Sequence, residues 1–138
     1  MSQTPETILV VEDAETVRKM VCAMLTQSGY DCLEASDGAE AVRLLEASNH
    51  VQLVLTDMVM PNMSGSDLAN HLSRTRPELR IVFMSGYTED PVVRTIEKAA
   101  PIFLPKPFTA AALKEKIRQA LDRPWDGLPE LRRDSRLP

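Results

Sequence analysis

The chain of 138 residues has few aromatic side chains, few cysteines and no long apolar run. Aromatic residues make up only 4%, so its core must be built mainly from aliphatic residues and methionine. Two cysteines, Cys22 and Cys32, are too few for a disulfide-rich scaffold and suit a reducing compartment. No apolar run exceeds about six residues, whereas roughly 18 are needed to cross a bilayer, and the first residues carry no apolar signal segment. We therefore expect a cytoplasmic protein without membrane insertion.

Positive charge is also scarce. The formal net charge is -4 and the isoelectric point is near 5.2, which argues against a nucleic-acid surface. With 43% hydrophobic and 26% charged residues, the chain can bury one core without disulfide bonds or structural metal ions to stabilise it. We expect one domain over residues 1–123. Residues 124–138, rich in proline and charge, are predicted to be a C-terminal tail or linker whose Trp125 packs back on the domain.

Short apolar runs alternate with stretches of helical spacing along the chain. The runs lie at residues 8–11, 31–35, 53–56, 81–84 and 102–104. Several are continuously apolar, as in strands that are covered on both faces. Such alternation predicts an α/β fold with a doubly wound, five-stranded parallel sheet and five helices, the fourth over about residues 91–98.

The predicted helices carry local boundary signals. Asp37 and Thr109 are expected N-caps, and Gly29 is expected just after the first helix. The spacing of Met20 with its apolar neighbours places it on the buried face of that first helix; the whole face is Val17, Met20, Val21, Met24 and Leu25.

Polar side chains follow four of the predicted strands. Glu12 and Asp13 follow the first strand, Asp57 the third, Ser85 the fourth and Lys106 the fifth. In a parallel sheet these ends share one edge, where ligands bind. Three carboxylates offset by one ammonium leave a net charge of about -2, which a divalent cation neutralises; carboxylate oxygens favour Mg²⁺, or Mn²⁺, over zinc.

Four segments carry a resemblance to a known family. VVEDAE, LTDMVMPNMSG, FMSGYTED and FLPKPF resemble, in order and spacing, the receiver domain of two-component response regulators, such as the chemotaxis regulators. The resemblance covers about residues 6–123. It implies a flavodoxin-like fold with strand order 2-1-3-4-5 and a cis bond between Lys106 and Pro107.

The resemblance also implies roles for the residues at the strand ends. Asp57 would be the phosphoacceptor, with Ser85 and Lys106 as the hydroxyl and the ammonium that contact the phosphoryl group. Asp13 would bind Mg²⁺ directly together with Asp57 and the backbone carbonyl of Val59, and Glu12 would act through water. Ser85 and Phe103 would form the switch, and no organic cofactor is implied.

The expected partners follow from these roles. The phosphoryl donor would be a phosphohistidine on a sensor histidine kinase or a phosphotransfer protein, because His50 and His71 are both expected at the surface. A downstream protein would contact the surface formed by the fourth helix, the fifth strand and the fifth helix. The chain would be a signalling phosphoacceptor rather than an enzyme, with only self-phosphotransfer and self-dephosphorylation.

Alternative interpretations remain at this stage. An aspartyl phosphohydrolase would need a second carboxylate at position 59, where Val59 stands, and a nucleotide binder would need a glycine-rich phosphate loop. A docking domain that is never phosphorylated, or a receiver module cut from a hybrid histidine kinase, also fits the pattern. Val59 and Tyr87 offer no group to orient water, which predicts slow self-dephosphorylation. Gly65 is expected to need an unusual backbone angle.

Overall fold

A computed structural model describes residues 5–86, 102–125 and 127 of the chain. Within these residues it contains five strands and four helices. Their order and bounds are β1 Thr7–Val11, α1 Glu15–Gln27, β2 Asp31–Ala35, α2 Gly38–Ala47, β3 Val51–Asp57, α3 Gly65–Thr75, β4 Arg80–Ser85, β5 Phe103–Pro105 and α5 Ala110–Asp122. The helix expected near residues 91–98 lies outside the described residues.

The five strands form one parallel sheet in the order β2-β1-β3-β4-β5. This is the strand order that the resemblance implied, and the predicted doubly wound α/β fold is confirmed. The strand order reverses beside β1, since the chain moves outward from β1 to β2 and then returns to β3 on its other side. The carboxyl ends of β1 and β3 therefore flank the crevice in which such sheets bind ligands.

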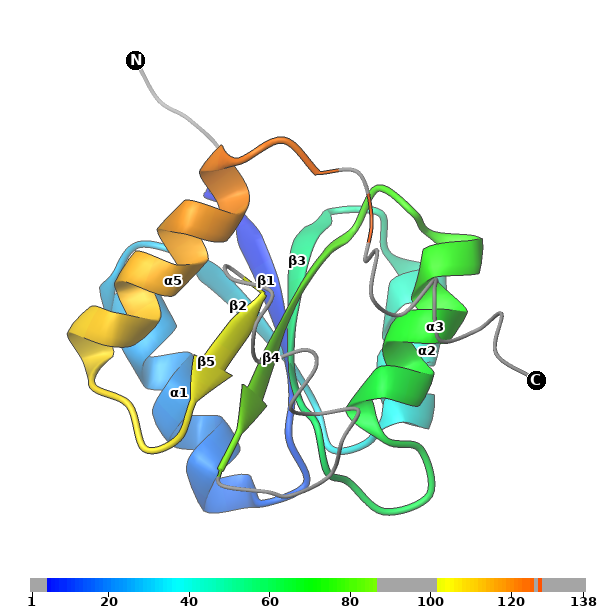
Figure 1. Cartoon of the computed structure of the whole chain (residues 1–138), viewed down its shortest axis with the longest axis horizontal. Helices are drawn as coiled ribbons and strands as arrows, with labels where there is room; N and C mark the ends of the chain where they lie inside the picture. The colour runs from blue at the N-terminus through cyan, green and yellow to red at the C-terminus, as the bar shows by residue number, and fades with distance from the viewer. Residues whose placement is uncertain (1–4, 87–101, 126, 128–138) are drawn as a thin grey trace.

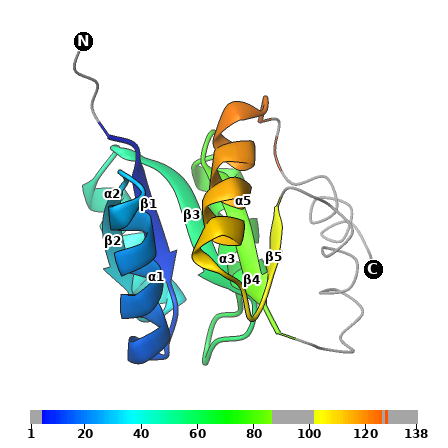
Figure 2. The same cartoon turned by 90° about the vertical axis from the view of Figure 1, so that its left-hand side faces the viewer.

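Helices cover both faces of the sheet, with α1 and α5 on one side and α2 and α3 on the other (Figures 1 and 2). Successive residues of β1 feed two separate cores. Ile8 and Val10 pack with α1 and α5, whereas Leu9 and Val11 pack with α2 and α3. Burial on both faces explains why β1 is continuously apolar rather than alternating.

Local side-chain contacts fix the ends of the helices where the sequence predicted them. Asp37 accepts a hydrogen bond from the amide of Glu40 at 2.8 Å, and Thr109 accepts one from Ala112 at 3.0 Å. Gly29 has a φ of 98°, a left-handed conformation that favours glycine after a helix. These three predictions are confirmed.

The predicted inner face of α1 is wrong at one position. Met20 is 48% exposed, and the buried residues of α1 are Val21, Cys22 and Leu25. The helix is rotated about its axis so that Cys22, rather than Met20, enters the core shared with α5. A hydrophobic stripe allows several rotations of a helix, and packing against the sheet selects one of them.

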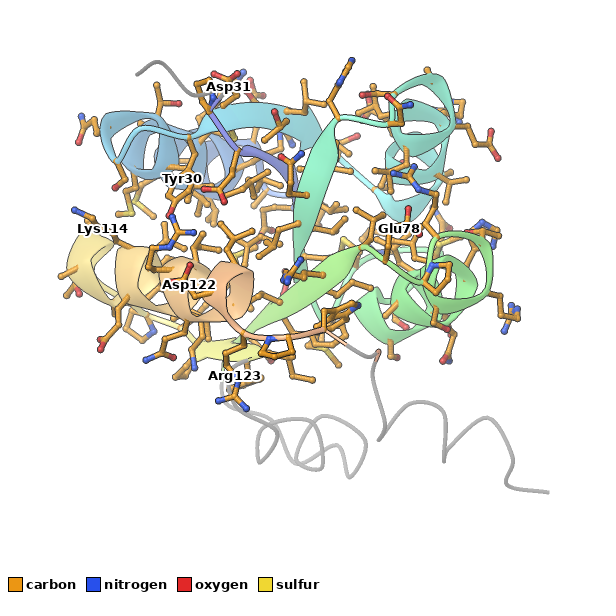
Figure 3. The ribbon with its side chains drawn as sticks, turned by 90° about the horizontal axis from the view of Figure 1, so that it is seen from above. Tyr30, Asp31, Glu78, Lys114, Asp122 and Arg123 are labelled. Atoms are coloured by element: carbon orange, nitrogen blue, oxygen red, sulfur yellow. The ribbon has the colours of Figure 1, made fainter. Side chains whose placement is uncertain are left out.

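The end of the sheet where the strands begin is closed by contacts between distant segments. The Trp125 indole nitrogen donates to Pro77 O at 3.1 Å, and its ring packs against the core of α2 and α3, so the expected packing back of Trp125 is confirmed. Figure 3 looks onto this end, where Tyr30 points toward α5 and receives a hydrogen bond from Arg118 at 3.3 Å. Among the described helices, none is both long and apolar enough to span a bilayer.

Candidate functional site

Three carboxylates meet beyond the carboxyl ends of β1 and β3. Val11 pairs with Thr56 in the parallel register, so Glu12 and Asp57 come next on neighbouring strands. Glu12 is 2% exposed and Asp57 8% exposed, while Asp13 faces the solvent. One carboxylate oxygen from each of the three lies within 4.8 Å of the other two. The sheet thus brings together the acidic residues that the sequence analysis selected.

Lys106 bridges the two buried carboxylates. Its Nζ lies 3.1 Å from Glu12 Oε1 and 3.4 Å from Asp57 Oδ2. Its backbone amide donates to Ser85 O at 2.8 Å, which attaches the loop after β5 to the end of β4. The peptide bond between Lys106 and Pro107 is cis, as the resemblance implied. Hydrogen bonding of its backbone and ion pairing of its side chain therefore both hold Lys106 in position.

Burial and the ion pairs shift the pKa values of this group in opposing ways. Burial raises the pKa of Glu12 above its ordinary value, although hydrogen bonds from the Ala14 amide and from Lys106 act in the other direction. Burial also opposes the charged form of Lys106, but its contacts with Glu12 and Asp57 outweigh this effect and raise the pKa of Lys106. Lys106 thus remains an ammonium between two carboxyl groups.

The acidic residues differ in their free ligand capacity. Both oxygens of Glu12 are engaged, Oε1 with Lys106 and Oε2 with the amide of Ala14. Asp13 makes no hydrogen bond or ion pair with any residue that the structure describes. Three carboxylates and one ammonium carry a net charge of -2. Every atom that the three carboxylates offer to a metal ion is a hard oxygen. This donor set fits a magnesium-type divalent ion.

The loop after β3 passes close to α3 at Gly65. A Cβ atom at Gly65 would contact the backbone carbonyl oxygen of Asp57 and would lie 2.9 Å from Met58 Cα. The expected unusual backbone angle is wrong: Gly65 is not among the positive-φ residues described, whereas Asn62 has a φ of 72°. Glycine is needed here for space, because any side chain would push the Asp57 loop away.

Arg18 supports the acidic pair, and the sequence analysis missed it. Its Nη1 donates to Glu12 O at 2.9 Å, and its Nε donates to Glu34 Oε1 at 3.0 Å. It therefore joins α1, β2 and the backbone that carries Glu12 and Asp13. The sequence shows a basic residue one turn into the helix that follows the acidic pair. This did not predict its contacts, because one partner is distant in sequence and the other is a backbone oxygen.

The predicted switch residues are both buried. Ser85 ends β4, and its hydroxyl donates to Gly86 O at 3.1 Å. Phe103 is 5% exposed and packs in the core of α2 and α3. Its inward turn on phosphorylation stays a prediction, and the ring is already buried in this structure.

The remaining predicted positions surround the site or lie away from it. Val59 is exposed, and its amide lies 3.5 Å from Asp57 Oδ1. Tyr87 lies outside the described residues. Of the two histidines, His50 is exposed and His71 is half-buried on α3, so neither is part of the acidic group.

Comparison with known proteins identifies the family. The sequence profile of the response regulator receiver domain matches residues 8–118. The chemotaxis protein CheY1 of Helicobacter pylori is 34% identical over 120 residues, which cover 83% of this chain and 95% of that protein. A receiver domain protein of Clostridium thermocellum superposes with a TM-score of 0.77 at 29% identity, covering 86% of this chain and 95% of the other.

Larger proteins also contain a similar segment. The sensor kinase CckA of Brucella abortus is 37% identical over 85% of this chain, and the transcriptional regulator NtrC of Rhizobium meliloti is 35% identical over 96% of it. The chain spans only 13% of CckA and 27% of NtrC. The profile match, the CheY1 match and the fold agree. The chain belongs to the response regulator receiver domain family.

Proposed function

We propose that this chain is a phosphorylation-dependent signalling module that accepts a phosphoryl group on Asp57 from a phosphohistidine of a sensor histidine kinase or a phosphotransfer protein. The observation that carries the proposal is the position of Asp57: its carboxylate lies at the end of β3, 3.4 Å from Lys106 Nζ and within 4.8 Å of two further carboxylates. Family membership supplies the reaction class.

The transfer requires a carboxylate nucleophile and charge neutralisation. An oxygen of Asp57 forms a bond to phosphorus while the bond from phosphorus to the donor's imidazole nitrogen breaks, and the electron pair stays on that nitrogen. Lys106 already contacts Asp57 and can turn its ammonium toward a phosphoryl oxygen. Glu12 keeps Lys106 at the site through the 3.1 Å ion pair.

Asp13, Asp57 and the Val59 carbonyl would hold Mg²⁺, and Glu12 would act through water because both of its oxygens are engaged. When bound, Mg²⁺ supplies neutralisation of the negative charge on the phosphoryl oxygens. Mn²⁺ would suit the same oxygen donors. The chain's own contribution is to keep the carboxylates at one edge and to expose Asp13 for binding.

The phosphoryl group would act on a partner through Ser85 and Phe103. A new acceptor on Asp57 competes with Gly86 O for the Ser85 hydroxyl. A hydrogen bond to a charged acceptor contributes roughly 1.5 to 3 kcal/mol, enough to shift an equilibrium about 10- to 150-fold. The loop after Ser85 would then move inward and stabilise the buried position of Phe103. The surface formed by β5 and α5, together with the expected fourth helix that lies outside the described residues, would carry this change to a downstream protein.

The match to CckA favours a second arrangement, in which a receiver of this kind is one module of a hybrid kinase and exchanges its phosphoryl group with a phosphotransfer protein. Both arrangements use the same chemistry at Asp57. Transfer from Asp57 back to a phosphotransfer histidine distinguishes a relay module from a receiver that only docks on its target.

The test is exposure of the full chain to acetyl phosphate and Mg²⁺, followed by intact mass and alkali treatment. We expect one phosphoryl group per chain, lost in base and absent when Mg²⁺ is chelated. Asp57→Asn should abolish the adduct. The matched control is Asp31→Asn, which removes an exposed carboxylate at the opposite end of the sheet and should label normally. Equal labelling of both variants would refute Asp57 as the acceptor.

A further inference from the structure

The interface between α1 and β2 contains a pair of thiols that the acidic site does not use. Cys22 lies in α1 and is 8% exposed, and Cys32 is the second residue of β2 and is half-buried. Cys22 belongs to the core that α1 and α5 form with the sheet, and Cys32 packs against that same core. The Cys32 thiol also donates to Leu33 O at 3.7 Å. They are the only cysteines of the chain. The chain's two cysteines thus share one core between α1 and β2, and both are free thiols.

Secondary structure and one ion pair bring the thiols together. Arg18 and Cys22 lie four residues apart on one face of α1, and Cys32 and Glu34 lie two residues apart on one face of β2. The ion pair between Arg18 Nε and Glu34 Oε1, at 3.0 Å, therefore fixes the layer next to the thiols. Lys19 Nζ contacts the other oxygen of Glu34 at 3.1 Å. The packing of α1 on β2 thus places the two thiols on facing sides of one interface.

The surroundings make one member of the pair the more reactive. The neighbouring Cys32 thiol is the largest influence on Cys22 and lowers the pKa of its thiol against the opposing effect of burial, and the positive charges of Lys19 and Arg18 act in the same direction as Cys32. The pKa of the Cys32 thiol is raised, chiefly by the Cys22 thiol beside it and by burial. Because the thiolate is the nucleophile, Cys22 would react first and Cys32 would resolve the product.

We propose that Cys22 and Cys32 form a site of reversible oxidation, at which hydrogen peroxide converts the dithiol to an intrachain disulfide joining α1 to β2. The Cys22 thiolate attacks one peroxide oxygen, the O–O bond breaks, and a sulfenic acid and hydroxide form. The Cys32 sulfur then attacks the sulfenic sulfur. The S–S bond forms, the S–O bond breaks, and water leaves with the Cys32 proton. The hydroxide takes up the proton that Cys22 had lost, so two thiols and one peroxide give one disulfide and two waters.

The disulfide would constrain the chain without involving the acidic site. It closes the segment that contains the end of α1, Gly29 and the start of β2. Such a short loop loses conformational freedom in the unfolded chain, which raises thermal stability. Cys22 lies about two turns along α1 from the end that faces Asp13, so the acidic group should keep its metal and phosphoryl chemistry. The oxidised protein would then be a more rigid receiver with an unchanged acceptor.

The experiment treats the full chain with hydrogen peroxide at increasing ratios, blocks free thiols with N-ethylmaleimide and measures the intact mass. We expect a monomer two hydrogens lighter that takes up no maleimide and regains two labels after dithiothreitol. A proteolytic digest should yield one linked pair of peptides containing Cys22 and Cys32. The melting temperature should rise by about 10 °C on oxidation and return on reduction.

Single variants separate this outcome from general oxidation. Cys22→Ser and Cys32→Ser each keep one thiol, so neither should gain stability with peroxide, and the double variant Cys22→Ala/Cys32→Ala should be inert. If a variant folds poorly, the intact mass and the peptide digest of the oxidised wild-type protein still test the proposal. Disulfide-linked dimers as the main product, or wild-type protein that still takes up two maleimide groups after oxidation while its circular dichroism is native, would overturn the proposal.

Discussion

The two ends of the sheet treat charge in opposite ways. At the carboxyl end, Glu12, Asp13 and Asp57 crowd together with one ammonium, and their negative charge exceeds the positive charge by two. At the amino end, arginines meet the carbonyl groups at the ends of helices. Arg76 Nη1 donates to Leu45 O at 3.0 Å, at the end of α2.

The amino end uses the same arrangement on the other face of the sheet. Arg80 Nε donates to Ala120 O at 2.8 Å, and its Nη2 donates to Arg123 O at 2.9 Å, at the end of α5. Neither α2 nor α5 has a basic residue in its own last turn, so these arginines supply the missing positive charge from other elements. The comparison indicates that one end balances its charges, whereas the other keeps an excess of negative charge.

The largest effect is expected from a methyl group placed in the loop at the carboxyl end. Gly65→Ala should lower the free energy of unfolding by about 3 kcal/mol, because its Cβ would contact the Asp57 carbonyl and move the acceptor loop. The measurement is urea denaturation followed by circular dichroism. Gly86→Ala is the control, since its Cβ would meet no atom within 4 Å and should change stability little. Equal losses in both variants would contradict the close approach at Gly65.

A smaller loss is expected at the amino end. Arg80→Met should lower the free energy of unfolding by about 2 kcal/mol, because two carbonyl groups near the end of α5 lose a charged donor. Phosphoryl acceptance from acetyl phosphate should stay at the wild-type level, since the site is at the other end. Arg43→Met removes an exposed arginine of α2 and serves as the control. A clear drop in phosphoryl acceptance by the folded Arg80→Met protein would contradict the idea that the two ends of the sheet act separately.

The smallest effect has the opposite sign. Asp13→Asn should raise the free energy of unfolding by about 1 kcal/mol in low salt without Mg²⁺, because it removes a charge that repels Glu12 and Asp57 and breaks no described contact. In Mg²⁺ the gain should reverse, and phosphoryl acceptance should fall. Thermal melts with and without Mg²⁺ give both quantities, with Asp31→Asn as the control. An Asp13→Asn protein that is less stable than the wild type without Mg²⁺ would refute the idea of stored repulsion.

The sequence predicted those features that depend on neighbouring residues. Asp37 and Thr109 bond to amides three residues away, and Gly29 adopts its left-handed angle within one turn. Strand identity followed from continuous apolar runs that fit a sheet covered on both faces. The acidic group followed as well, because parallel strands place their carboxyl ends at one edge. That Glu12 and Asp57 are direct neighbours followed from the strand order that the resemblance implied.

The features that failed or were missed depend on packing. The rotation of α1 is decided by its contact with the sheet, which exposes Met20 and buries Cys22. Gly65 is required by the approach of two backbone segments, and a glycine in a sequence does not distinguish such an approach from a special φ. Arg18 donates a hydrogen bond to a backbone oxygen. Every residue has such an oxygen, so the sequence does not identify this partner.

Trp125 offers an optical consequence of its hydrogen bond to Pro77. As the sole indole of the chain, it should dominate the ultraviolet emission, and it lies at the end of the sheet where the strands begin, opposite the end that carries Asp57. Its emission should stay constant through local events around Asp57 and should respond when Trp125 leaves its site beside Pro77. A change in fluorescence on adding a phosphodonor would therefore show that a conformational change extends from Asp57 along the strands to the opposite end of the sheet.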